Sequence, residues 1–247
     1  GSGLYGSHPF LMQVTRPKAL AHGMLLLNSN AMDVLLSRDT ISYRTIGGVL
    51  DMYFFLGPTP ADVVAQYTDL VGKPLLPPYW GLGFQLCRWG YGSVQATKKV
   101  VEGMRAARMP QDVQWNDIDY MQAMMDFTLD PKAYEATAMQ TLVADLHQHN
   151  QRYTMIIDPG ISSTPTEGQY PPLDDGKRMG VFVKNAKGDW LTGKVWPGLV
   201  HFPDFLNPGA PYYWSEQLAT FHRLLDYDGV WLDMNEPSNF CDGECEG

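Results

Sequence analysis

Cysteine is scarce in this sequence, which limits how the fold can be held together. Only three cysteines occur among the 247 residues, namely Cys87, Cys241 and Cys245, too few for a disulfide scaffold. Cys241 and Cys245 lie four residues apart in the acidic segment CDGEC. A local disulfide is therefore feasible, whereas two thiols with no histidine nearby do not indicate a metal site.

Basic residues, long apolar runs and nucleotide-binding motifs are also lacking. The chain has 18 Lys and Arg against 27 Asp and Glu, a net charge of −9, which argues against nucleic acid or an anionic membrane as a partner. No apolar run approaches membrane-spanning length. There is no glycine-rich phosphate loop, no dinucleotide fingerprint and no Asn-x-Ser/Thr sequon. The hydrophobic fraction of 45% is that of a globular chain with a sizeable core.

The first part of the chain predicts β structure. Short apolar or alternating runs at residues 24–27, 34–36, 41–44 and 49–56 are separated by Asn, Ser, Asp and Gly, a spacing that suits an antiparallel sheet or part of a sandwich. A helix follows, with Thr59 as N-cap, Pro60 at its first position and Gly72 at its end. We therefore expect one domain at residues 1–72, comprising the end of a β-sandwich and a linker helix.

The second predicted domain, residues 73–247, has a different pattern of apolar residues. Apolar runs near residues 80–86, 112–118, 153–157 and 229–232 alternate with helical patterns near residues 93–108, 133–149 and 210–225, and a long Gly-, Pro- and Trp-rich insertion follows the third run. Such alternation predicts an α/β fold whose parallel strands are joined by right-handed crossovers.

Three of the predicted strands end in an aspartate. Asp117, Asp158 and Asp233 each follow an apolar run, and in parallel α/β folds the carboxyl ends of the strands are where ligands bind. Aromatic residues occur at the same level of the fold, namely Trp89, Trp115, Tyr120 and Trp196. Carboxylates accept hydrogen bonds from hydroxyl groups while indoles stack on C–H faces, so the sequence predicts a cleft for a neutral, polyhydroxylated ring.

Two chemistries use such a cluster of carboxylates. In glycoside hydrolysis one carboxylate is the nucleophile or base, and a second, neutral at the working pH, is the acid. Alternatively, the carboxylates could hold Mg²⁺ for proton abstraction in a lyase. The metal hypothesis lacks a Lys or His base at a strand end, because the four histidines of this domain (His147, His149, His201 and His222) lie on predicted helices or in the insertion.

Several long motifs make the sequence resemble glycoside hydrolase family 31, in the branch of lysosomal acid, intestinal and plant α-glucosidases. The resemblance runs nearly end to end, and WLDMNEPSNF is close to the nucleophile signature of that family. The motifs are YGSHPF at residues 5–10, LLNSNAMDV at 26–34, GGVLDMYFFLGP at 47–58, PPYWGLGFQLCRWGY at 77–91, DVQWNDIDYM at 112–121, IIDPGIS at 156–162, GKVWPG at 193–198, FPDFLNP at 202–208 and WLDMNEPSNF at 231–240.

The resemblance implies a role for each candidate site residue. Asp233 would be the nucleophile of a retaining mechanism, with Glu236 assisting it. Asp117 would hold hydroxyl groups at the far end of the nonreducing glucose, and Asp158 would support the subsite. The subsite would be lined by Trp89, Ile118, Ile156, Trp196 and Met234. No metal and no cofactor are implied.

The resemblance also implies a fold that this sequence contains only in part. Family members have a β-sandwich before a (β/α)₈ barrel, so we expect a sandwich segment followed by the first four β/α units of a TIM barrel, an incomplete chain. The acid/base Asp of the family lies beyond Gly247. The implied partners are an α-glucoside oligosaccharide and the missing C-terminal half of the barrel, in the same gene product or a second chain. We therefore expect residues 1–247 alone to be inactive.

The function expected is that of a retaining exo-acting α-glucosidase that hydrolyses terminal nonreducing α-linked glucose from maltose-like oligosaccharides. Two alternatives stay open at this stage. One is an α-xylosidase of the same family, and the other is a noncatalytic carbohydrate-binding or structural fragment. The acidic pI of about 5.0 and the habit of the family suggest the secretory pathway, whether lysosome, vacuole or extracellular space.

Overall fold

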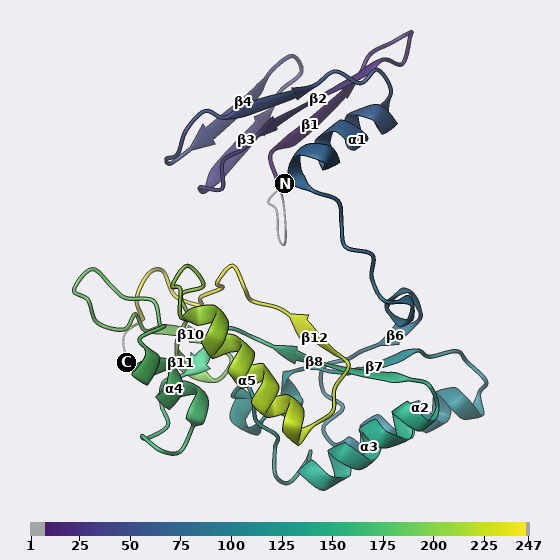
Figure 1. The fold of residues 1–247 in the computed structure, drawn as a ribbon, viewed down its shortest axis with the longest axis vertical. Helices are drawn as coiled ribbons and strands as arrows, with labels where there is room; N and C mark the ends of the chain where they lie inside the picture. Colours follow the sequence, from purple (N-terminus) through teal and green to yellow (C-terminus); the bar gives the residue numbers. More distant parts are fainter. Residues whose placement is uncertain (1–7, 246–247) are drawn as a thin grey trace. The chain divides into compact units, whose positions relative to one another are not determined.

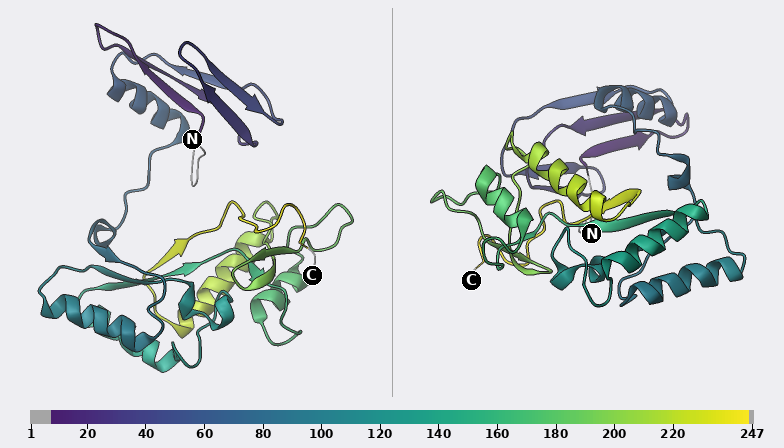
Figure 2. Two further views of the ribbon diagram at one scale, coloured as in Figure 1. Left: turned by 180° about the vertical axis from the view of Figure 1, so that it is seen from behind. Right: turned by 60° about the horizontal axis from the view of Figure 1, so that its bottom comes forward.

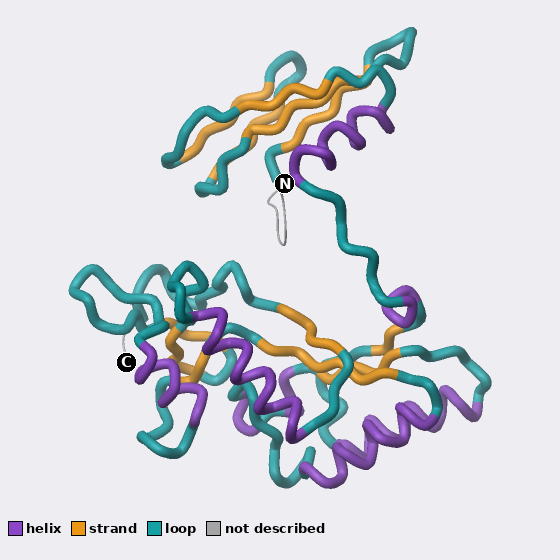
Figure 3. The backbone as a smooth tube through the Cα atoms, in the orientation of Figure 1, coloured by secondary structure: helices purple, strands orange, loops and turns teal. Residues whose placement is uncertain are grey.

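The computed structural model describes residues 8–245, and the chain divides into two compact units after Leu76. The division falls in the Pro-rich segment that joins them, which Figure 3 shows as loop. Each unit has its own sheets and its own buried core, and each is therefore described by itself.

The first unit combines two small antiparallel sheets with one helix (Figure 1). Strands β1 (Phe10–Val14), β2 (Ala21–Leu26) and β5 (Met52–Phe55) form one sheet in the order β1-β2-β5, and β3 (Met32–Leu36) pairs with β4 (Ile41–Thr45). The strands predicted for this region are present, although β5 is shorter than the apolar run that predicted it. Strand β1 was not predicted.

Helix α1 (Pro60–Val71) begins as its sequence predicts. The hydroxyl of Thr59 accepts a hydrogen bond from the Asp62 amide while the Asp62 carboxylate accepts one from the Thr59 amide, a reciprocal pair that satisfies two free donors of the first turn. Val63 packs into a core with Ala21, Leu25 and Phe55. Helical spacing predicts one apolar face of Val63, Val64, Tyr67, Leu70 and Val71. Only part of that face is buried in this unit, since Val64, Leu70 and Val71 are nearly half exposed.

The second unit is built on a parallel sheet of four strands. These are β6 (Gln85–Leu86), β7 (Val113–Asn116), β8 (Arg152–Ile157) and β12 (Gly229–Leu232), in the order β12-β8-β7-β6, and every neighbouring pair is parallel. The predicted alternation is therefore observed, with helices α2 (Val94–Ala106), α3 (Ala136–Gln148) and α5 (Ala210–Leu224) between successive strands. One continuous core joins all three helices to β8.

The first of these strands differs from the prediction. Most of the apolar run at 80–86 is not a strand, because Tyr79–Leu82 forms a 3-10 turn and only Gln85–Leu86 pairs with β7. The Asp112 carboxylate accepts a hydrogen bond from the Phe84 amide at 2.8 Å and lies where a β-carbon on Gly83 would sit. This side-chain contact replaces a backbone ladder that periodicity alone would have extended.

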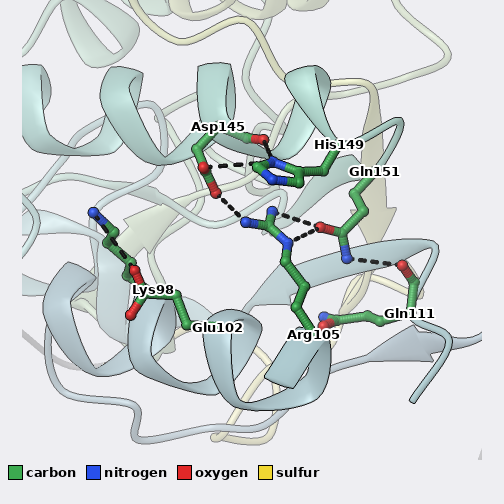
Figure 4. A network of polar contacts seen from close by, with 7 residues as sticks. All are labelled: Lys98, Glu102, Arg105, Gln111, Asp145, His149 and Gln151. Atoms are coloured by element: carbon green, nitrogen blue, oxygen red, sulfur yellow. Dashed lines mark hydrogen bonds and ion pairs between the residues drawn. The ribbon is translucent and has the colours of Figure 1, made fainter. Parts of the chain in front are cut away.

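The helices were predicted more accurately than the strands. The hydroxyl of Ser93 caps α2 by accepting a hydrogen bond from the Ala96 amide. Helical spacing predicts that one face of α3 is buried, and all four of its apolar residues are, namely Met139, Leu142, Val143 and Leu146. Figure 4 shows how α2 and α3 are joined at their C-terminal ends. Arg105 donates to Asp145 at 2.7 Å and twice to the side-chain oxygen of Gln151, just before β8.

The insertion after β8 folds into structure that the sequence did not predict. Strands β9 (Ile161–Ser162), β10 (Gly193–Val195) and β11 (Gly198–His201) form a small antiparallel sheet in the order β10-β11-β9, and α4 (Pro171–Met179) packs beside it on a core of Ile161, Tyr170, Leu173 and Phe182. Figure 2 shows these elements gathered at one end of the second unit. They are too short for hydrophobic periodicity to identify.

The segment after β12 runs along this insertion. The Phe240 amide donates to the Lys194 carbonyl at 2.9 Å, and the Cys245 amide to the Thr192 carbonyl at 2.8 Å. Cys241 and Cys245 form the local disulfide that their spacing allowed. The helices of the described residues include none that is long and apolar enough to cross a membrane.

Candidate active site

The three predicted aspartates leave the parallel sheet at the same edge. Asp158 follows Ile157 and Asp233 follows Leu232, and these two strand residues are paired neighbours in β8 and β12. On the other side of β8, Asn116 of β7 pairs with Met155, so Asp117 follows β7 at the level of Ile156, two residues before Asp158. The register thus brings three carboxylates from distant parts of the chain to one end of the sheet.

A cleft of about 390 Å³ opens at this edge. Six of the predicted site residues line it, together with two that were not predicted. The lining residues are Trp89, Asp117, Ile118, Met124, Ile156, Trp196, Trp231 and Asp233. Two carboxylates therefore lie among three indoles and aliphatic side chains, which is the mixture that the sequence predicted for a sugar-binding cleft.

Of the two unpredicted residues, Trp231 could have been identified from the sequence pattern and Met124 could not. Trp231 precedes Asp233 by two residues, and alternate residues of a strand face the same side, so the strand period could have identified it. Its register partner is Ile156, which also lines the cleft. Met124 lies in a 3-10 turn (Gln122–Met124) and has a backbone φ of 59°, a conformation that no local sequence signal predicts.

Two of the aromatic residues expected near the cleft have other positions. Tyr120 is fully buried, and its hydroxyl donates to the Ile156 carbonyl at 2.8 Å, so it is a core residue. Trp115 does not line the cleft but lies against Trp231, with ring centroids 5.9 Å apart. It supports the wall of the cleft from behind.

Asp158 lies beneath the cleft and does not line it. It is 4% exposed, and its Oδ1 has no hydrogen-bond partner within residues 8–245. Burial, followed by the negative charges of Asp233, Asp117 and Glu236, raises its pKa to about 7. A pKa in that range suits a general acid, but a carboxyl without access to the cleft cannot protonate a leaving group there.

A second buried carboxyl, Asp126, holds Asp158 in place. Its Oδ1 accepts a hydrogen bond from the Asp158 amide at 2.8 Å, and its own carbonyl accepts one from the Tyr170 hydroxyl at 2.9 Å. Burial, reinforced by the charge of Asp158, raises the pKa of Asp126 well above its ordinary range. No sequence pattern identifies Asp126, because it does not follow a predicted strand.

Met234 and Glu236, like Asp158, do not line the cleft. Met234 packs against Val195, Val200 and Phe202 of the insertion, and its φ of 62° is left-handed, a backbone conformation uncommon for a residue with a β-carbon. Glu236 is exposed and accepts a hydrogen bond from the Ser238 hydroxyl. Neither residue is placed to touch a ligand between Trp89 and Trp196.

The electrostatics of the cleft favour a neutral ligand. The pKa of Asp117 is raised, first by burial and then by the charges of Asp119 and Asp233, although the Ile118 amide donates to its carboxylate at 2.7 Å. None of the eight lining residues is basic. No group of three or more His, Cys, Asp or Glu suited to a metal ion occurs in the described part of the chain.

Comparison with known proteins agrees with this geometry. The model of the glycosyl hydrolases family 31 TIM-barrel domain matches residues 74–247, which is more than half of the chain. The chain belongs to glycosyl hydrolase family 31. The family domain includes the parallel sheet, the insertion and every residue of the cleft.

Individual family 31 proteins match over nearly the whole chain. The lysosomal alpha-glucosidase of Mus musculus is 52% identical over 248 residues, covering 100% of this chain and 26% of that protein. Alpha-xylosidase 1 of Arabidopsis thaliana is 45% identical, covering 98% of this chain and 26% of that protein. The chain thus spans about a quarter of the length of these curated relatives.

A solved structure shows the same fold. The family 31 alpha-glucosidase from Bacteroides thetaiotaomicron superposes with a TM-score of 0.86 at 30% sequence identity, covering 99% of this chain and 40% of that one. The α/β class predicted for the second unit is therefore confirmed, and the family to which the motifs pointed is confirmed as well.

Proposed function

We propose that this chain is part of a retaining exo-acting α-glucosidase that removes terminal nonreducing glucose from maltose-like oligosaccharides. The observation that carries the proposal is the cleft itself, in which Asp233 and Asp117 lie among Trp89, Trp196 and Trp231. A sugar offers hydroxyl groups to carboxylates and C–H faces to indoles, and a neutral substrate meets no charge repulsion from the acidic lining.

Asp233 is the proposed nucleophile. It follows the last residue of β12, so a rigid strand fixes its position, and it lines the cleft at a site open enough for contact with substrate. In the retaining mechanism its carboxylate attacks the anomeric carbon and forms a covalent glucosyl ester, which water then hydrolyses. Asp117 follows β7, on the other side of β8 from β12, and accepts hydrogen bonds from the sugar hydroxyls.

Asp158, Glu236 and Met234 support this site without touching the sugar. Asp158 packs beneath it, and its raised pKa keeps a third negative charge from accumulating beside Asp233 and Asp117 at acidic pH. Met234 fixes the backbone after the nucleophile against the insertion. Glu236 contributes a nearby negative charge from its place in the motif.

The acid that protonates the leaving group is proposed to come from residues beyond Gly247. Among the residues described, no other carboxyl lines the cleft besides Asp117 and Asp233. We further propose that the first unit is a β-sandwich segment and that the four parallel strands are the first four β/α units of a (β/α)₈ barrel. The remaining half, in the same gene product or a second chain, would then complete the site.

The test is hydrolysis of an α-glucoside by the full-length protein, with the anomer of the first-released glucose read by NMR. A retaining enzyme releases α-glucose first, and Asp233→Asn lowers kcat by roughly a thousandfold or more, because a neutral carboxamide cannot attack the anomeric carbon to form the glucosyl ester. Release of β-glucose first, or unchanged kcat in Asp233→Asn, contradicts the proposal. Glu236→Gln is the matched control and retains measurable activity.

An α-xylosidase is the second candidate, because the Arabidopsis protein named alpha-xylosidase 1 is 45% identical over the same residues. The two substrates differ by one hydroxymethyl group. Comparing kcat/KM for p-nitrophenyl α-glucoside and α-xyloside decides between them, and the α-glucosidase proposal requires the glucoside to be preferred.

We also propose a secretory-pathway location, in the lysosome, the vacuole or outside the cell. The Cys241–Cys245 disulfide suits an oxidising compartment, and the Mus musculus relative is named as lysosomal.

A further inference from the structure

Trp89 forms one wall of the cleft from a loop that has little structure of its own. It lies between β6 and the cap of α2, and its side chain is 63% exposed. The two glycines that follow, Gly90 and Gly92, have φ values of 82° and 76°, in the region that side chains rarely adopt. A loop with two such glycines needs an external restraint to hold an exposed indole in one place.

The carboxylate of Asp119 supplies that restraint. Its Oδ1 accepts a hydrogen bond from the Gly90 amide at 3.2 Å, and its Oδ2 accepts one from the Gly92 amide at 3.0 Å. Gly90 directly follows Trp89, and Gly92 lies two residues further along the same loop. Hydrogen bonds from amides to a charged acceptor are stronger than those to a neutral one, so this one side chain fixes the backbone on which the indole is carried.

Asp119 is itself held by a buried tyrosine. The Tyr134 hydroxyl donates to Asp119 Oδ2 at 2.7 Å, and Tyr134 is fully buried in the main core. Burial, together with the Asp119 charge, raises the pKa of Tyr134, so its phenol stays protonated and keeps donating. The chain of contacts therefore runs from the core through Tyr134 and Asp119 to the loop of Trp89.

Asp119 also belongs to the segment that forms the floor of the cleft. The 3-10 turn Ile118–Tyr120 is capped by Asp117, and Asp117 and Ile118 line the cleft while Asp119 bonds to the neighbouring loop. One short turn thus carries Asp117, which lines the cleft, and Asp119, which binds the loop of Trp89.

We infer that Asp119 is a positioning residue that holds Trp89 against the bound sugar through the amides of Gly90 and Gly92. This inference rests on the proposed glycosidase function for its kinetic consequence, but the hydrogen bonds stand independently of it. Because the indole contacts the sugar in the ground state and in the transition state alike, loss of its position weakens binding more than chemistry.

The first test is kinetic and uses the full-length protein. Asp119→Asn places an amide NH₂ against the donors that Asp119 accepts from, namely the Gly90 and Gly92 amides and the Tyr134 hydroxyl. We expect it to raise KM for maltose by about tenfold, the size expected when a set of charge-assisted hydrogen bonds is lost. The effect on kcat should be much smaller. Trp89→Ala is expected to raise KM similarly. The double variant should be no worse than Trp89→Ala alone, since both changes remove one effect.

Asp130→Asn is the matched control. Asp130 lies on the same connection between β7 and α3 and likewise accepts two backbone amide hydrogen bonds on its side chain, from Lys132 and Ala133 at 2.8 Å each. None of the hydrogen bonds described for Asp130 reaches the Trp89 loop. It should lose stability without a change in KM. Equal KM effects in Asp119→Asn and Asp130→Asn, or additive effects of Asp119→Asn and Trp89→Ala, overturn the inference.

The second test does not depend on hydrolysis. Amide hydrogen exchange at Gly90 and Gly92 should be accelerated by about tenfold or more in Asp119→Asn, and left unchanged in Asp130→Asn. Unchanged exchange in Asp119→Asn overturns the inference whatever the kinetics. Faster exchange in a protein that hydrolyses no α-glucoside refutes the proposed function alone and leaves the hydrogen-bonded restraint of the loop standing.

Discussion

The carboxyl of Asp158 stays protonated in the folded protein at pH values at which it would be ionised in the unfolded chain. Its pKa of about 7 in the folded protein compares with an ordinary value of 3.8, and the first cause is burial of a carboxyl whose Oδ1 has no partner within the described residues. Such a carboxyl is stable when neutral, so ionisation at this position destabilises the fold. Protonation of Asp158 at acidic pH removes this destabilisation.

The first prediction concerns the pH dependence of stability. Between about pH 4 and pH 7 the folded state keeps the proton on Asp158 and the unfolded state has released it, so the free energy of unfolding falls as pH rises through that window. The fall is on the order of 3 kcal/mol. Asp158→Asn removes it, and urea unfolding at pH 4.5 and pH 7 measures the difference. Some pH dependence of the free energy of unfolding should remain in Asp158→Asn, because the pKa of Asp126 is also raised.

The control for this prediction is Asp189→Asn, at an exposed carboxylate in the insertion. This variant should show the same difference in the free energy of unfolding between pH 4.5 and pH 7 as the unaltered protein. An Asp158→Asn variant that retains the whole slope would show that its proton is not the source.

At the scale of residues, the sequence identified the cleft by its carboxylates and strand ends. Asp117 and Asp233 line it because a buried strand ended at each, which is a pattern visible in the sequence. Trp231 was accessible to the same reasoning through the strand period. Met124 and Asp126 were not, because tertiary contacts and unusual backbone angles place them, and neither leaves a periodic trace.

At the scale of elements, the ends of helices α2 and α3 depend on Arg105. Its guanidinium bonds to Asp145 and to Gln151 at partly buried positions, and Gln151 in turn donates to the Gln111 carbonyl at 2.8 Å. Figure 4 shows this network joining two helices to the starts of two strands.

The second prediction is that Arg105→Met lowers the free energy of unfolding by about 2 kcal/mol, because several hydrogen bonds to a charged group are lost together. Lys98→Met is the matched control on the same helix. Lys98 pairs with Glu102 at 3.8 Å on an exposed surface, and such a pair contributes no more than about 0.5 kcal/mol. Equal losses in chemical denaturation of the two variants would contradict the importance of the network.

The third prediction concerns the segment after β12. The Cys241–Cys245 disulfide closes a short loop, so replacing both cysteines by serine should cost about 2 kcal/mol or less. Reductant should lower the melting temperature of the unaltered protein and leave that of the double variant unchanged. Cys87→Ser, at a cysteine that is free and exposed, should keep the full response to reductant.

The elements show where sequence patterns succeed. Helix α3 was predicted together with its buried face because its apolar residues recur with helical spacing over more than three turns. Strand β6 was predicted too long because Asp112 takes the Phe84 amide and Gly83 packs against it. The insertion was missed because α4 and the β9–β11 sheet are short and are held by packing on Phe182 and Tyr170.

At the scale of the whole molecule, the parallel sheet has two edges, β6 and β12. Leu232, the last residue of β12, is 63% exposed, beside the proposed nucleophile. Within the described residues no strand pairs with the outer side of β12, and such an edge, with an exposed apolar side chain, suits the proposed barrel of further strands.

The fourth prediction follows from the proposal that the acid lies beyond Gly247. The purified chain of residues 1–247 should not hydrolyse a chromogenic α-glucoside, whereas the full-length protein should. Adding the remaining half of the barrel as a separate chain should restore activity if the two halves assemble. Measurable turnover by residues 1–247 alone would show that the acid is already present in them.

Asp233 is the proposed nucleophile, and trapping its covalent glycosyl ester shows whether it attacks the sugar. The full-length protein is treated with a 5-fluoro α-glucosyl fluoride and digested, and the labelled peptide is sequenced by mass spectrometry. We predict a glycosyl ester on Asp233 and no label in Asp233→Asn. A label on Asp117, Asp158 or Glu236, or inhibition with no covalent label at all, would contradict the account.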